Sequence, residues 1–308
     1  PPRSTQSRSS AASDVYKRQF IISGGAESMS RAPFVMPKAD SAFSRNAEIY
    51  DTTIGWRFVN PKMKSNYGID SMPETAENVA EKFQITRQDQ DLFAYRSQIK
   101  ASNSIDNGRI SKEILPVTIK QRKKDDLIVD KDEHPRFGLK LSDLEKLKTV
   151  FKENGTVTAG NSSGINDGAA ALLLTNLEEA EKKSIKPLAK IVSWASVGVD
   201  PSLMGLGPIK AVKEAVNKAK WSLEDVDLFE INEAFAAQSI AVIQELKNDK
   251  KKVNVNGGAI SLGHPIGASG ARILVTLLHE MIKQNKNKGC ATLCIGGGMG
   301  IALCIEKS

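Results

Sequence analysis

The second half of the sequence alternates between short apolar runs and amphipathic stretches, and this alternation restricts the fold more than any other feature. It predicts strands at 188–197, 226–230 and 253–256, helices at 209–219, 233–246 and 267–283, and a terminal hairpin that pairs 290–295 with 300–306. Alternating strands and helices indicate a layered α/β domain built around a mostly buried sheet.

The first half is less regular. Apolar runs that begin at Phe20 and span 169–175 predict two more strands, and the second is followed by a predicted helix at 177–183. Between them, the pattern predicts helices at 73–83 and 87–105, strands at 114–120 and 127–129, and an irregular stretch at 34–66. Residues 34–160 are therefore expected to form a mixed α+β insertion.

Residues 1–19 are polar, rich in serine and without periodicity, which predicts disorder. The end of this segment, SDVYKRQ, resembles the translated end of a sequencing adaptor. We therefore expect residues 1–19 to be a non-native addition, with a natural flexible arm as the alternative.

Composition narrows the class of protein and of partner. Hydrophobic residues make up 40% and charged residues 26%, and no apolar run is long enough to cross a bilayer, so no membrane partner is expected. The net charge of +7 falls to +4 once residues 1–19 are set aside, which suits an anionic ligand but not a nucleic acid.

Cys290, Cys294 and Cys304 make a poor disulfide framework and predict a reducing cytoplasm. Cys290 and Cys294 also lack metal-site spacing, so no metal is expected.

Three polar residues stand where predicted strands or glycine-rich loops end: Asn232, His264 and Cys294. Ligands of α/β sheets bind beyond the strand ends, so these side chains are candidates for one pocket. Each has an ordinary alternative, because asparagine and histidine often cap helices and buried cysteine often acts as a small apolar residue. The glycines near His264 and Cys294 favour a site, since they allow close backbone approach and present N–H groups to an oxyanion.

Several long motifs, in order, resemble those of the thiolase family. They are GGAESMSRAPF (24–34), TAENVA (75–80), GTVTAGNSSGINDGAAALLL (155–174), MGLGPI (204–209), NEAFAAQ (232–238), NVNGGAISLGHPIGASGAR (254–272) and CIGGGMGIA (294–302). The resemblance implies a thiolase fold, layered α-β-α-β-α, with two similar halves and an inserted loop domain. It assigns 20–33 and 161–185 to an incomplete first half, 34–160 to the loop domain and 186–308 to the C-terminal half.

The resemblance also implies roles for residues. His264 matches the base that deprotonates the nucleophilic cysteine, Cys294 the second, acid/base cysteine, Asn232 the residue of the first oxyanion hole, and the Gly296 N–H a donor of the second. Residues implied to contact coenzyme A or the acyl chain are Ser163, Arg136, Met72, Met204 and Phe235. Coenzyme A is expected as a substrate, with no tightly bound cofactor, and the family assembles as homodimers or homotetramers.

The sequence departs from the family in one respect. The family's nucleophile lies in a Cys-Gly-Ser-Gly type of motif upstream of GGAESMS, and none of these 308 residues forms such a motif. We expect the chain to be an N-terminally truncated thiolase that is inactive as it stands, with a non-catalytic acyl-CoA-binding protein as the alternative. The upstream reading frame of the source DNA discriminates between the two.

The motifs disagree about the acyl substrate. Segments 51–81 and 132–138 resemble 3-oxoadipyl-CoA thiolases of aromatic-compound degradation, whereas Val255, Ile266, Ala268 and the glycines at 296–298 are more similar to acetoacetyl-CoA thiolases. We give more weight to the first segments, because they lie in the loop region that lines the family's acyl pocket. Arg57 is a candidate partner for the 3-oxoadipyl carboxylate, and a surface role for it is the alternative.

Overall fold

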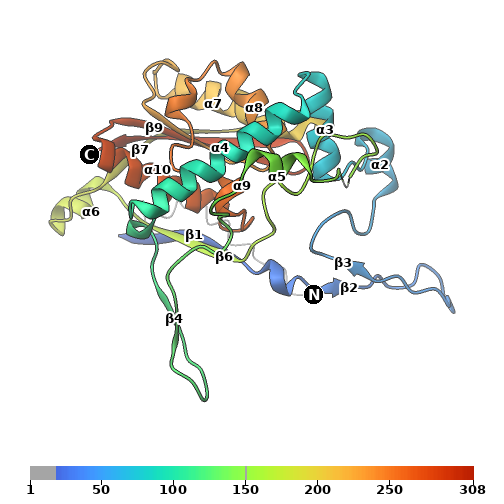
Figure 1. The fold of residues 1–308 in the computed structure, drawn as a ribbon. Helices are drawn as coiled ribbons and strands as arrows, with labels where there is room; N and C mark the ends of the chain where they lie inside the picture. Colours follow the sequence, from blue (N-terminus) through green and yellow to red (C-terminus); the bar gives the residue numbers. More distant parts are fainter. Residues whose placement is uncertain (1–18, 150) are drawn as a thin grey trace.

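The computed structural model describes residues 19–149 and 151–308 (Figure 1). Nearly all of the segment expected to be foreign, residues 1–18, lies outside the described residues. The strands are β1 (Phe20–Glu27), β2 (Phe34–Val35), β3 (Tyr50–Asp51), β4 (Val117–Ile119), β5 (Leu127–Val129), β6 (Gly168–Thr175), β7 (Ala189–Gly198), β8 (Leu228–Ile231), β9 (Lys288–Ile295) and β10 (Met299–Lys307). The α-helices are α2 (Pro61–Tyr67), α3 (Met72–Lys82), α4 (Arg87–Asp106), α5 (Leu141–Glu145), α6 (Leu177–Lys182), α7 (Gly207–Lys218), α8 (Ala236–Glu245), α9 (Ala259–Leu262) and α10 (Ser269–Gln284). Short 3₁₀ helices are η1 (Met29–Arg31), η2 (Ile110–Lys112), η3 (Pro201–Leu206) and η4 (Lys250–Lys252).

The main sheet has four strands in the order β7-β10-β9-β8. The predicted terminal hairpin is confirmed: β9 and β10 pair antiparallel, with Cys294 opposite Gly300. Strand β8 runs parallel to β9, so the carboxyl ends of these two strands lie at the same edge of the sheet.

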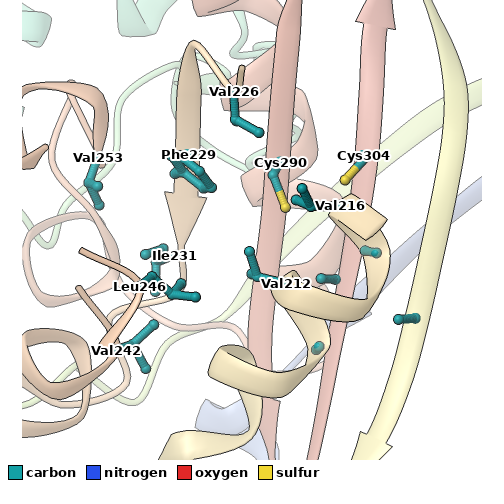
Figure 2. Packing of buried hydrophobic residues seen from close by; sticks show 14 of the residues in the cluster. Val212, Val216, Val226, Phe229, Ile231, Val242, Leu246, Val253, Cys290 and Cys304 are labelled. Atoms are coloured by element: carbon teal, nitrogen blue, oxygen red, sulfur yellow. The ribbon is translucent and has the colours of Figure 1, made fainter. Parts of the chain in front are cut away.

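Successive side chains along each strand of the main sheet point to opposite faces, and each face packs against its own hydrophobic core. On one face Phe229, Ile231 and Cys290 pack against Val212 and Val242 of helices α7 and α8 (Figure 2). The other face is covered by α10, and its core is formed by Leu228, Ala291, Ile305, Ile273, Leu277 and Met281.

Helix α10 is also covered on its other side, by the antiparallel pair β1–β6 (Figure 1). The described residues thus form successive layers of helix, sheet, helix and sheet, which agrees with the layered α/β architecture expected from the sequence. The outer face of the β1–β6 pair is apolar and open, with Ile22 79% and Leu173 61% exposed.

The insertion between β1 and β6 contains the predicted helices and strands, and one helix that the sequence analysis missed. Helices α3 and α4 and the hairpin β4–β5 lie where they were predicted, and the hairpin projects away from the body (Figure 1). Helix α2 lies in the stretch expected to be irregular. Its start follows a recognisable signal, because the Asn60 side chain accepts a hydrogen bond from Lys62 N at 2.9 Å and Pro61 occupies the first turn.

The prediction of a strand at 253–256 is wrong. Only a single bridge joins Val253 to Phe229, because Asn254 adopts a left-handed backbone with φ of 44°. The Asn254 side chain replaces a strand neighbour: its oxygen accepts from Ile231 N and its nitrogen donates to Ile231 O, both at 2.8 Å. The side-chain amide of Asn254 therefore takes up the hydrogen-bonding capacity of the Ile231 N–H and C=O groups at the edge of β8.

Two predicted helices begin later than expected. Helix α8 begins at Ala236, because Phe235 remains extended and forms a bridge with Ser162. Helix α10 begins at Ser269, after a turn in which Pro265 O accepts hydrogen bonds from the N–H groups of Ala268 and Ser269, both at 2.8 Å. Across the described part of the chain, no helix combines the length and apolar character needed to span a bilayer.

Candidate active site

Asn232 and His264 meet at the carboxyl edge of the main sheet, although 32 residues separate them in sequence. Asn232 directly follows β8 and is 1% exposed, and its side-chain nitrogen lies 3.3 Å from His264 Nε2. His264 itself follows the turn that ends α9. The predicted pairing of these two residues in one site is consistent with this geometry.

The other ring nitrogen of His264, Nδ1, contacts a serine hydroxyl. Ser269 Oγ lies 2.6 Å from His264 Nδ1 and donates its only proton to Pro265 O at 2.9 Å. In the arrangement in which this hydroxyl donates to Pro265 O, it accepts from Nδ1–H, and Nε2 then carries the lone pair. The Asn232 amide N–H points at that lone pair, and a long bond of this kind leaves Nε2 able to accept a proton from a substrate or nucleophile.

Burial keeps the His264 imidazole neutral. Desolvation, and then the charge of Arg272, lower the pKa of His264 to about 4. Arg272 Nη1 lies 3.9 Å from Glu230 Oε2, and burial raises the pKa of Glu230 to about 8 although Arg272 opposes this. At neutral pH His264 is thus a base with its lone pair available.

Cys294 lies at the same edge as Asn232. The backbone N–H of Asn232 donates to Thr292 O at 3.0 Å, and Thr292 lies two residues before Cys294 on β9. Burial raises the pKa of the Cys294 thiol to about 11. This thiol therefore holds its proton at neutral pH and is a candidate proton donor, whereas His264 is a candidate proton acceptor.

Gly296 lies in the turn between β9 and β10, where it faces the loop insertion. A Cβ placed on Gly296 would lie 3.8 Å from Met72 Sδ at the start of α3. Met72 also lines a small cavity, together with Trp56, Met63, Tyr67, Gly68, Asp70, Pro201, Ser202 and Gly297. This cavity therefore adjoins the turn that follows Cys294.

A second cavity lies between α4, α9 and the segment 134–160. Arg136 lines it with Gln98, His134, Leu139, Leu144, Ala159, Gly160 and Ile260. The backbone N–H of Arg136 donates to Gln98 Oε1 at 2.9 Å, so the buried Gln98 holds this wall to α4.

The remaining predicted contact residues do not line either cavity. Ser163 is tied to the segment after Asn232, because its N–H donates to Ala234 O at 3.0 Å and Ser162 forms a bridge with Phe235. Met204 is buried in η3 and is not among the residues that line either cavity. Arg57 donates to Gly55 O and also lies outside both linings.

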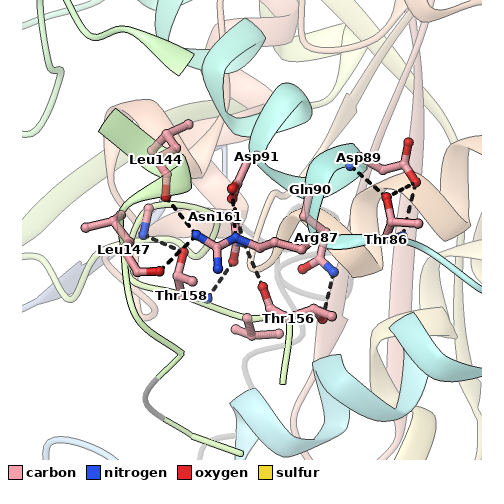
Figure 3. Close-up of polar contacts among 12 residues, drawn as sticks. Thr86, Arg87, Asp89, Gln90, Asp91, Leu144, Leu147, Thr156, Thr158 and Asn161 are labelled. Atoms are coloured by element: carbon pink, nitrogen blue, oxygen red, sulfur yellow. Dashed lines mark hydrogen bonds and ion pairs between the residues drawn. The ribbon is translucent and has the colours of Figure 1, made fainter. Parts of the chain in front are cut away.

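A buried polar network holds the loop that carries Ser163 (Figure 3). Arg87 donates to Asp91 at 2.7 Å and to the carbonyls of Leu144 and Leu147. Asp91 in turn accepts from Asn161 Nδ2 at 3.0 Å. This network connects the start of α4 to both α5 and the loop, and the sequence analysis gave no sign of it.

Glu233 organises the loop that leads to His264. Its buried carboxylate accepts from Ser97 Oγ at 2.6 Å and from Asn254 Nδ2 at 2.8 Å. Gly258 approaches it so closely that a Cβ there would lie 2.2 Å from the Glu233 carboxyl carbon. The glycine at 258 is therefore required by packing against a residue adjacent to Asn232. Within the described residues, no group of three or more His, Cys, Asp and Glu side chains is arranged to hold a metal ion.

Comparison with known proteins identifies the family. The family model described as "Thiolase, N-terminal domain" matches residues 10–178, and so includes part of the segment expected to be foreign, while "Thiolase, C-terminal domain" matches residues 185–307. A β-ketoadipyl-CoA thiolase of Pseudomonas aeruginosa is 52% identical over 291 residues, which cover 94% of this chain and 72% of the relative. An acetyl-CoA acetyltransferase of the same organism is 51% identical over 290 residues, with the same two coverages.

Solved structures agree with the family models. The crystal structure of the Bacillus anthracis acetyl-CoA acetyltransferase matches with a TM-score of 0.89 and 44% identity, over 97% of this chain and 75% of that one. Human mitochondrial 3-ketoacyl-CoA thiolase in complex with CoA matches with a TM-score of 0.87 and 40% identity, over 96% of this chain and 72% of that one. The fold expected from the motifs is confirmed, and this chain belongs to the thiolase family of acyltransferases.

Proposed function

We propose that this chain supplies the acid/base part of a thiolase that cleaves 3-oxoacyl-CoA thioesters with coenzyme A. The observation that carries the proposal is the contact of 3.3 Å between His264 Nε2 and the Asn232 side-chain nitrogen, at the sheet edge where β9 ends with Cys294 nearby. A base and a protonated thiol at one edge are the two proton-transfer groups that thiolysis needs.

The first half of the reaction breaks the carbon–carbon bond. His264 Nε2 takes the proton of the nucleophilic cysteine, and the resulting thiolate attacks the C3 carbonyl carbon. The C2–C3 bond then breaks, its electron pair moves to C2, and the Cys294 thiol gives its proton to C2. Acetyl-CoA leaves, while the acyl group remains on the nucleophile as a thioester. The raised pKa of Cys294 suits this donor role, because the thiol arrives protonated.

The second half transfers the acyl group to coenzyme A. The Cys294 thiolate takes the proton of the incoming CoA thiol, and the CoA thiolate attacks the thioester carbon. The new acyl-CoA forms as the nucleophile leaves as a thiolate beside protonated His264. Each half forms an oxyanion: Asn232 and His264 are proposed to stabilise one, and the Gly296 N–H the other.

The nucleophile itself is proposed to come from a Cys-Gly-Ser-Gly motif that these 308 residues lack. Cys290 and Cys304 do not substitute for it, since both are 0% exposed in the core of the main sheet. If the full-length protein also lacks such a cysteine, the chain is instead an acyl-CoA-binding protein.

The acyl substrate proposed first is 3-oxoadipyl-CoA, cleaved to succinyl-CoA and acetyl-CoA. Relatives named β-ketoadipyl-CoA thiolase are 51–53% identical to this chain, and one from Escherichia coli is named 3-oxoadipyl-CoA/3-oxo-5,6-dehydrosuberyl-CoA thiolase. Such relatives support an acyl chain that ends in a carboxylate.

One observation favours acetoacetyl-CoA as a second candidate. Among the described residues that line the cavity beside Gly297, the single charged side chain is Asp70, and it carries the same charge as the 3-oxoadipyl carboxylate. Like charges in a poorly solvated site repel, so an uncharged acetoacetyl tail suits this lining better. The acetyl-CoA acetyltransferase relative is also as similar to this chain as several of the others.

The substrate proposal is tested in a completed enzyme, defined as this chain joined behind a thiolase N-terminal segment that carries the Cys-Gly-Ser-Gly motif. We expect kcat/KM for 3-oxoadipyl-CoA to exceed that for acetoacetyl-CoA by about tenfold or more, the size expected from one well-placed specificity contact. Steady-state thiolysis with both substrates measures the ratio, and a ratio below one supports the second candidate instead.

Two variants locate the carboxylate partner. Arg57→Met should reduce kcat/KM for 3-oxoadipyl-CoA alone if Arg57 turns from Gly55 O to the substrate. Asp70→Asn should raise it if the tail enters the cavity beside Gly297. Equal changes for both substrates would show that these side chains act on structure and not on the acyl tail.

Two further properties belong to this proposal. We infer a homodimer or homotetramer from the family resemblance. We infer a reducing, cytoplasmic location because all three cysteines are free, even though Cys290 and Cys304 are cross-strand neighbours.

A further inference from the structure

Asn166 connects the sheet edge that carries Asn232 and His264 to the second cavity. It lies within the motif at 155–174, but it has no role in the proposed reaction. Its side-chain oxygen accepts the backbone N–H of His264 at 3.1 Å, across 98 residues of sequence. The neighbouring Ile165 forms a parallel bridge with His264, so the loop after Ser163 lies directly against the base.

The Asn166 side chain approaches the backbone before His264 so closely that position 263 requires a glycine. Gly263 has a φ of +97°, and a Cβ there would lie 2.7 Å from Asn166 Oδ1. The Asn166 amide therefore packs against the Gly263 backbone while it holds the next N–H group. A left-handed residue and a long-range hydrogen bond together define the backbone from which the His264 ring projects.

His134 determines which way the Asn166 amide faces. His134 Nε2 lies 3.2 Å from Ile260 O, which can only accept, so Nε2 carries the proton and Nδ1 carries a lone pair. Asn166 Nδ2 lies 3.5 Å from that Nδ1 and points its N–H at it. With the nitrogen of the amide directed at His134, its oxygen is directed at the His264 N–H.

We propose that Asn166 is a positioning residue for His264, with His134 in the wall of the second cavity orienting the Asn166 amide. The proposal rests on the role of His264 as the base under "Proposed function". It implies that the second cavity and the base are joined through one side chain, so that a ligand which moves His134 also acts on His264.

Hydrogen exchange of single amides in the 308-residue chain tests the positioning without any catalysis. In Asn166→Leu, which keeps the size of the side chain and removes both polar atoms, the His264 amide should exchange about tenfold faster, as expected for the loss of one ordinary hydrogen bond. Asn166→Asp keeps an acceptor oxygen and should leave the His264 amide protected.

Asn176→Leu is the matched control, because Asn176 is also half-buried and its oxygen accepts a backbone N–H, that of Glu179 at 2.8 Å. This variant should speed exchange at Glu179 and leave His264 unchanged. Should Asn166→Leu fail to fold, the unmodified chain still gives a test: a scalar coupling through the hydrogen bond from His264 ¹⁵N to Asn166 ¹³Cγ is expected, and its absence contradicts the proposal. So does an unchanged His264 amide in folded Asn166→Leu.

The functional consequence is measured in the completed enzyme. Asn166→Leu should lower kcat about tenfold and leave KM for coenzyme A near its parental value, since it displaces the base but not the ligand contacts. A parental kcat would overturn the positioning role. Failure of the completed parent to catalyse thiolysis would instead count against the proposed function, while the exchange results would remain interpretable.

Discussion

Replacing His264 with alanine in the completed enzyme should lower kcat by about a thousandfold, within the roughly 10²–10⁴-fold range of general acid–base catalysis. The variant loses the Nε2 lone pair that would deprotonate the nucleophile and the N–H that would then stabilise the substrate oxygen. Both act on the transition state, so KM should change much less than kcat. Steady-state thiolysis of 3-oxoadipyl-CoA and acetoacetyl-CoA measures both constants.

His279→Ala provides the matched control for this prediction. His279 is also half-buried and lies on α10, the helix whose first residue, Ser269, contacts His264. It has no place in the proposed chemistry, so its replacement should leave kcat within about twofold of the parent, as for residues that make no transition-state contact. Near-parental turnover by His264→Ala would remove His264 from the mechanism.

Replacing Cys294 with alanine should separate proton transfer at C2 from acylation of the nucleophile. The thiol holds its proton because burial raises its pKa to about 11, and it is proposed to deliver that proton to C2. Without it, kcat for thiolysis should fall by roughly a hundredfold or more, the lower part of the range for a lost general acid. Acylation of the nucleophile by a simple acyl-CoA needs no C2 proton transfer, and the CoA thiolate that leaves can take its proton from water when Cys294 is absent, so the initial release of coenzyme A should persist.

Two readouts and one control test the Cys294 prediction. Deuterium exchange at C2 of acetyl-CoA should be lost in Cys294→Ala while the burst of coenzyme A release is kept. The control is Cys304→Ala, which should leave both readouts intact. It should lower the free energy of unfolding by about 1 kcal/mol, as for a small deletion in a core. Loss of the burst in Cys294→Ala, or retention of C2 exchange, would contradict the acid/base assignment.

The sequence was sufficient to predict the elements whose pattern is local. Strand β8 and the β9–β10 hairpin follow from apolar runs broken by polar or glycine residues, and α3 and α4 follow from their periodicity and caps. The meeting of Asn232 with His264 followed from the rule that ligands bind beyond strand ends, together with the family motifs. The predictions of these strands and helices succeeded because the signal and the structure lie in the same short segment.

The sequence was insufficient where a side chain takes the place of the backbone. Asn254 completes the edge of β8 with its amide, so a segment that resembled a strand forms a left-handed turn. Ser269 and Asn166 define the tautomer and backbone of His264 through contacts that no periodicity encodes, and Asn166 lies 98 residues away. The cap at Asn60 was the exception, because its Asn-Pro signal was readable and was overlooked.

A neutral His264 with its proton on Nδ1 is the central feature of the proposed site, and a ¹⁵N NMR titration of the histidine-labelled 308-residue chain measures this directly. The chain has three histidines, so variants of His134 and His279 assign the signals. We expect the His264 ring to carry its proton on Nδ1 and to remain neutral down to pH 5, because its pKa is lowered to about 4, whereas an ordinary histidine is mostly protonated there. The unfolded chain binds that proton more readily, so the free energy of unfolding should also fall as pH decreases from about 6.5 towards 4. Ser269→Ala should mix the two tautomers. A pKa of 6.5 or above for His264 would contradict the lowering of its pKa by burial, and a proton on Nε2 at neutral pH would contradict the base that this site is proposed to provide.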